Sequence, residues 1–149
     1  MLTNDGARFW GTVSILFGLD QATKYAARVV LDHARVIDFG LLQLNLVFNK
    51  GAAYGILTDF TVVLTIIGVL VIAYLTVQLR TLIVNRVTFL SYAFLLAGAM
   101  GNTIDRLLFG QVTDFLNIHI IPVFNVADVC LNIGLGLLLV HFFWYERRV

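Results

Sequence analysis

Long apolar stretches with almost no charge constrain this chain more than any other feature. Residues 60–79 carry no charged side chain over twenty positions, residues 87–104 add eighteen such positions, and residues 129–145 add seventeen. A helix rises about 1.5 Å per residue, so about 20 apolar residues cross a hydrocarbon core of about 30 Å. These lengths predict three membrane-spanning helices.

A fourth span is predicted near the N-terminus. Residues 9–19 are uncharged but too few to cross a bilayer, so a span there must continue through Asp20 and Lys24 towards Leu31. A removable signal peptide is the alternative, but Asp5 precedes the apolar stretch and no A-x-A-like site follows it. We therefore expect one all-α membrane domain, residues 1–149, with four transmembrane helices at about 9–31, 60–79, 87–107 and 128–145.

The composition excludes several other classes of protein. The chain is 60% apolar and 13% charged, whereas a soluble domain carries about 25% charged residues. Ten Lys and Arg against nine Asp and Glu leave a net charge of +1, which argues against a nucleic-acid-binding protein. The single cysteine, Cys130, allows no internal disulfide and no Cys-based zinc site, and is interpreted as a packing residue.

Charge bias and short-range alternation predict how the chain is oriented. Five Lys or Arg residues flank the spans on the side of the N-terminus and three on the opposite side, so both termini are expected in the cytoplasm. The two outer segments, residues 32–59 and 107–127, contain runs with a period of two at 42–48 and 116–120. This period is typical of half-buried strands, so small extracytoplasmic β elements are expected there.

Five polar clusters lie near the predicted outer ends of the spans. They are DQATK at 20–24, NKGAAYG at 49–55, GNTIDR at 101–106, VTDF at 112–115 and FNVAD at 124–128. An ionisable side chain at mid-bilayer costs about 2.5–3.5 kcal/mol on insertion scales. Their gathering on one side therefore indicates a functional site at the outer interface.

Each cluster also has a purely structural interpretation. Asp20 and Lys24 are four residues apart and can form an ion pair on a helix. Asn125 and Asp128 have the spacing of a helix N-cap with an acid in the first turn. Asp114, in an expected loop, can simply be solvated.

Asp114 and Asp128 together are less well explained by these interpretations. They are fourteen residues apart across an expected loop and can converge. Two adjacent carboxylates share a proton, so one can act as base and the other as acid with water as nucleophile, without metal or cofactor. A proton-coupled transporter is the alternative, although transporters usually carry mid-bilayer polar groups and internal repeats. An assembly subunit, packing through glycines at 134–136, is a further alternative.

In this order, the five clusters resemble the bacterial lipoprotein signal peptidases (signal peptidase II), and the resemblance covers about residues 9–140. It implies an aspartic endopeptidase of the bacterial inner membrane with its active site at the outer, periplasmic face. The implied substrates are diacylglyceryl-modified prolipoproteins, which are cleaved just before the lipidated cysteine. Membrane lipids are the other implied partners. Globomycin-type cyclic peptides are the implied inhibitors, and no cofactor, metal or nucleic acid is involved.

The resemblance also implies roles for individual residues. Asp114 and Asp128 match the catalytic pair. The positions associated with substrate binding or support of the site are Asn49, Gly51, Asn102, Arg106 and Asn125. Those interpreted as structural support are Asp20, Lys24 and Asp105.

Overall fold

The computed structural model describes residues 3–31, 35–51, 60–83 and 85–145. Within these ranges the elements are α1 (Thr3–Val30), β1 (Ile37–Asp38), β2 (Gln43–Asn49), α2 (Thr61–Val77), α3 (Leu79–Leu82), α4 (Arg86–Phe109), β3 (Val112–Asn117) and α5 (Val126–Tyr145). The expected mostly helical fold with a small β element is confirmed. Residues 52–55 of the NKGAAYG cluster lie outside the described residues.

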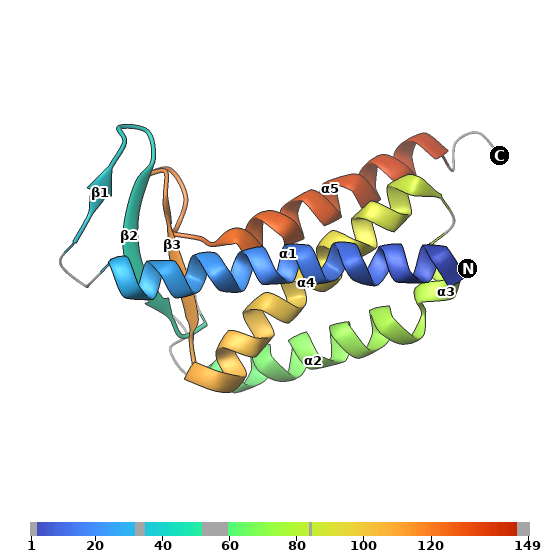
Figure 1. Ribbon diagram of the computed structural model, residues 1–149, viewed down its shortest axis with the longest axis horizontal. Helices are drawn as coiled ribbons and strands as arrows, with labels where there is room; N and C mark the ends of the chain where they lie inside the picture. Colours follow the sequence, from blue (N-terminus) through green and yellow to red (C-terminus); the bar gives the residue numbers. More distant parts are fainter. Residues whose placement is uncertain (1–2, 32–34, 52–59, 84, 146–149) are drawn as a thin grey trace.

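Helix α4 is the centre of the helical bundle. It packs against α1, α2 and α5, and the sheet lies at one end of these helices, whereas α1 begins and α5 ends at the opposite end (Figure 1). Small residues allow the close approach: a Cβ on Gly98 would lie 2.6 Å from the carbonyl oxygen of Ala127 in α5. The polar segments of α1, α4 and α5 therefore meet near the sheet.

The long helices differ in how well they suit a bilayer. Among the described residues, α4 and α5 have the length and apolarity of a membrane span, whereas α2 is apolar but only 17 residues long. Helix α1 is 28 residues long and begins six residues before the expected span, but buries Asp20 and Lys24 on its packed face. All four long helices occupy segments that the sequence predicts as spans.

Local sequence defines the two ends of α4. Before the helix, the Asn85 side-chain oxygen accepts a hydrogen bond from the Thr88 amide at 2.9 Å, and the Thr88 hydroxyl accepts one from the Asn85 amide at 3.0 Å. After the helix, Gly110 adopts a left-handed conformation with φ 68°, and its amide bonds the Arg106 carbonyl. The chain then enters β3 within two residues.

The sheet is antiparallel with the order β1-β2-β3, and β2 has a bulge between Leu44 and Val47. Strand β3 begins earlier than the alternation at 116–120 predicts, and His119 lies beyond its end with φ 66°. Asp114, expected in a loop, is therefore in a strand, opposite Val47 of β2. The prediction was wrong because the first four residues of β3 are all buried, which means that both faces of the strand are covered there. The sequence therefore shows no alternation of apolar and polar residues that would mark a strand.

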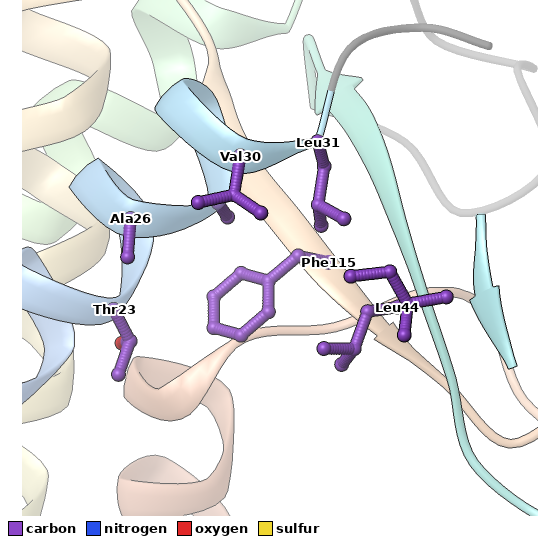
Figure 2. Close-up of a pocket in the computed structure, with 8 residues that line it drawn as sticks. Thr23, Ala26, Val30, Leu31, Leu44 and Phe115 are labelled. Atoms are coloured by element: carbon purple, nitrogen blue, oxygen red, sulfur yellow. The ribbon is translucent and has the colours of Figure 1, made fainter. Parts of the chain in front are cut away.

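The two faces of β3 have different environments. Phe115 points towards the end of α1, where it lines an apolar cavity of about 260 Å³ together with Val30, Leu31 and Leu44 (Figure 2). Successive residues of a strand point to opposite faces. Asp114 accordingly points away from this cavity, towards the start of α5.

Candidate active site

Asp114 is held by two asparagine side chains. It is only 2% exposed; its Oδ2 accepts a hydrogen bond from Asn49 Nδ2 at 3.0 Å and its Oδ1 one from Asn125 Nδ2 at 2.6 Å. Asn49 is oriented in turn by the Gly51 amide, which donates to its Oδ1 at 2.9 Å. Gly51 has φ 126°, which L side chains rarely adopt, and a Cβ there would lie 3.1 Å from Leu64. The turn after β2 therefore aims the Asn49 donor at Asp114.

Asp128 lies in the first turn of α5 and takes part in a reciprocal cap. Its Oδ2 accepts a hydrogen bond from the Asn125 amide at 3.1 Å, and its own amide donates to Asn125 Oδ1 at 3.0 Å. Its Oδ1 accepts a hydrogen bond from Asn102 Nδ2 at 2.8 Å. The predicted capping interaction is thus confirmed, and the same interaction orients the Asp128 carboxylate.

Asn125 connects the two carboxylates. It is fully buried, its Nδ2 donates to Asp114 and, at 3.2 Å, to Asn102 Oδ1, and its backbone amide donates to Asp128. The convergence of Asp114 and Asp128 expected from the sequence is supported by this shared residue. Burial raises the pKa of the Asp114 carboxyl to about 6, and the negative charge of Asp128 adds to the rise.

Asp20 and Lys24 of α1 form a buried ion pair, and Lys24 contacts Asn102 of the site. Lys24 Nζ lies 3.1 Å from Asp20 Oδ2 and 3.5 Å from Asp105 Oδ2, and all three side chains are at most 1% exposed. Asp20 Oδ1 also accepts a hydrogen bond from the Ala127 amide at 2.8 Å. Gly101 leaves the space for this arrangement, since a Cβ there would collide with the Asp20 carboxylate. The pair predicted along one helix is therefore part of a cluster that joins α1, α4 and α5.

Sequence reasoning missed Arg28 and Thr113. Arg28 donates to the Thr113 hydroxyl at 2.7 Å, lies 3.9 Å from Asp105 and covers the ring of Phe109. Asp105 also accepts a hydrogen bond from the Thr113 amide at 2.9 Å. This bond ties β3 to α4 one residue before Asp114. The available signal was that Arg28 follows Lys24 by four residues and so shares its face of α1.

Arg106 is half-buried near the end of α4 and lies within reach of the charges of Asp128, Asp114 and Asp105. Within the described part of the chain its Nε has no hydrogen-bond partner. The structure therefore brings all ten residues singled out from the sequence into one site or its immediate support.

The arrangement has the components for water-assisted hydrolysis. It combines two carboxylates with amide donors and a nearby guanidinium at the sheet end of the bundle. Among the described residues, no group of three or more His, Cys, Asp or Glu is placed to hold a metal ion. Such a pair can provide a general acid and a general base in one site.

Comparisons with known proteins point to one family. The family model described as signal peptidase (SPase) II matches residues 12–144. The chain is 39% identical to a lipoprotein signal peptidase of Microcystis aeruginosa in an alignment that covers 95% of each chain. It is 40% identical to that of Gloeothece citriformis in an alignment that covers 91% of this chain and 88% of the relative. A solved structure of a bacterial membrane enzyme is similar, with a TM-score of 0.84 and 28% identity, covering 93% of this chain and 94% of the other.

Proposed function

We propose a mechanism from one premise: the chain belongs to the signal peptidase II family. It is a membrane hydrolase that acts on proteins. We propose that Asp114 and Asp128 are its catalytic pair, and the observation that carries this assignment is that Asn125 holds both carboxylates. A residue that only capped α5 would need no side-chain hydrogen bond to β3.

The two carboxylates have different environments, and this suggests different roles. Asp114 is buried, and its pKa, raised to about 6, lets it keep its proton to a higher pH than an ordinary carboxyl, which suits the general acid. Asp128 is half-buried and its Oδ1 accepts a hydrogen bond from Asn102. An ionised Asp128 takes a proton from the attacking water while Asp114 protonates the scissile carbonyl oxygen. The resulting gem-diol then collapses: the ionised Asp114 takes back a proton from one hydroxyl as the carbonyl reforms and the C–N bond breaks, and the proton held by Asp128 passes to the leaving amine.

The remaining polar groups suit the charge that develops on the scissile carbonyl. Donors placed at a developing oxyanion stabilise the transition state. The Arg106 guanidinium is half-buried and lies in the field of both carboxylates, and its buried Nε has no hydrogen-bond partner among the described residues. We infer that Arg106 binds the substrate backbone there, and that Asn49 and Gly51 support the site by fixing Asp114.

The substrate class follows from the family. We propose that the enzyme removes signal peptides from diacylglyceryl-modified prolipoproteins by cutting before the lipidated cysteine, in the bacterial inner membrane. We further propose that α1, α2, α4 and α5 all span the bilayer, with both termini cytoplasmic and the sheet outside. The supporting observation is that α1 begins and α5 ends opposite the sheet (Figure 1). Globomycin-type cyclic peptides are expected to compete for the same site.

Cleavage of a diacylglyceryl-modified prolipoprotein by purified enzyme tests this assignment. Asp114→Asn and Asp128→Asn are each expected to lower kcat by at least about a hundredfold, because each removes an acid–base group. Asp38→Asn is the matched control, since Asp38 is an exposed carboxylate in the same sheet. Wild-type activity in either variant of the pair, with the control also active, would show that the pair is not catalytic.

A further inference from the structure

We propose that Lys24 is a positioning residue for the hydrolysis: it fixes the orientation of the Asn102 amide so that the amide nitrogen faces Asp128. The inference rests on the catalytic pair proposed above. It gives the DQATK cluster a role in the reaction beyond stabilising the bundle.

The hydrogen-bond chemistry allows only one orientation of this amide. Lys24 Nζ lies 3.1 Å from Asn102 Oδ1 and 3.2 Å from the Gly101 carbonyl oxygen, and the lysine is fully buried. An ammonium has three donors and no acceptor, so only the oxygen of the amide can face it. The nitrogen must then lie on the other side, where it donates to Asp128 Oδ1 at 2.8 Å.

Without the ammonium, the oxygen of the Asn102 amide keeps a single described donor, Asn125 Nδ2 at 3.2 Å, and that nitrogen also donates to Asp114 at 2.6 Å. The amide is then held less firmly on its oxygen side, and its nitrogen is less well aimed at Asp128. Asp128 loses part of a hydrogen bond that favours its ionised form, which is the form that takes the proton from water.

Lys24 acts through Asn102 and not on the substrate. Its side chain is completely inaccessible, and its described contacts are with Asp20, Gly101, Asn102 and Asp105. A change at Lys24 should therefore lower kcat and leave KM nearly unaltered.

The charged groups that influence Asp128 come from three elements. They are Arg106 of α4 and Asp114 of β3, which interact with Asp128 directly, and the buried cluster of Lys24 and Asp20 of α1 with Asp105 of α4, which reaches Asp128 through Asn102. Of these, Lys24 alone bonds the amide that donates to Asp128. Loss of that orientation should move the acid limb of the pH–rate profile to higher pH, because ionisation of the base becomes harder.

The variant must remove the ammonium without leaving an uncompensated charge. Lys24→Met alone would bury two carboxylates, Asp20 and Asp105, with only Arg28 nearby to balance them. Breaking a buried pair in this way often unfolds a protein. The double variant Asp20→Asn/Lys24→Met keeps the cluster neutral, and Asp20→Asn alone is its matched control because it keeps the ammonium on Asn102.

We expect Asp20→Asn/Lys24→Met to cleave with a kcat at least about tenfold below that of Asp20→Asn, with KM within about twofold and the acid limb shifted upwards. The same two variants are then compared in an Asn102→Ala background. There the loss of Lys24 should lower kcat by less than about twofold, because the hydrogen bond from residue 102 to Asp128 is already missing. An equal kcat and an unshifted pH–rate profile for Asp20→Asn/Lys24→Met and Asp20→Asn would overturn the proposal. So would a tenfold loss that persists in the Asn102→Ala background.

A second variant tests the same idea if the double variant does not fold. Asn102→Asp keeps an oxygen for Lys24 but presents an acceptor to Asp128, so it removes the hydrogen bond that the positioned amide donates to that carboxylate. Its kcat should fall at least about tenfold with the same upward shift of the acid limb, and an unchanged profile would refute the proposal. Inactivity of Asp114→Asn and Asp128→Asn, combined with no effect of these variants, would reject the role of Lys24 and leave the catalytic pair standing.

Discussion

Replacing Asp114 by Asn should change how the stability of the protein depends on pH. The pKa of the Asp114 carboxyl is about 6 in the folded chain against an ordinary 3.8, chiefly because the side chain is buried. The folded state thus holds this proton more tightly than the unfolded state. The stabilisation is fully present below about pH 4 and is lost as the pH rises through about 6. At about 1.4 kcal/mol for each pH unit between the two values, the loss is about 3 kcal/mol.

The measurement is the free energy of unfolding in detergent micelles, compared between wild type and Asp114→Asn across about pH 4 to 7. The variant also leaves Asn49 or Asn125 facing an amide nitrogen, which costs about 1–3 kcal/mol. That cost does not depend on pH, so it cancels when the difference between the two proteins is followed. Wild type should lose about 2–3 kcal/mol relative to the variant over this range.

Asp38→Asn is the control for this experiment. Hydrogen bonds from the Gly40 amide and the Gln43 side chain hold the pKa of the exposed Asp38 carboxyl below its ordinary value. Its contribution is therefore lost only as the pH falls below about 4, and the difference from wild type should stay flat between about pH 4 and 7. A flat difference for Asp114→Asn as well would refute the argument that Asp114 holds its proton in the folded protein.

Three further predictions follow from the geometry of the site and the bundle. In steady-state assays, kcat/KM should fall as the pH rises above about 6, because Asp114 then loses the proton it donates; a rate that is constant from about pH 5 to 8 would exclude that role. Gly101→Ala should lower the free energy of unfolding by about 1–3 kcal/mol, because the new Cβ meets the Asp20 carboxylate. Gly136→Ala is the control and should not destabilise the protein, because the space around Gly136 is open; equal effects in denaturant titrations would contradict this packing. In a Cys130→Ser background, Ile83→Cys should react with an impermeant thiol reagent only from the cytoplasmic side, and labelling from outside would invert the proposed topology.

Several features of the fold could be predicted because they depend on local sequence. The apolar stretches predict the long helices, since each helix satisfies its own backbone hydrogen bonds and needs only length and apolarity. The cap formed by Asn125 and Asp128 is also local and was predicted from their spacing. Strand β3 could not be located in this way, because its pairing with β2 comes from residues more than sixty positions earlier.

By itself, the amino-acid sequence determined that this protein belongs in a membrane, where its few charges had to lie, and which two carboxylates were candidates for the chemistry. Only the tertiary structure decided what those charges do. Asn125 hydrogen-bonds both carboxylates, and Lys24 reaches Asn102 from a different helix, across 78 positions of sequence. The physical reason is that the direction of a side-chain hydrogen bond depends on which donor and acceptor the packed helices bring together, and spacing along one chain carries no record of that.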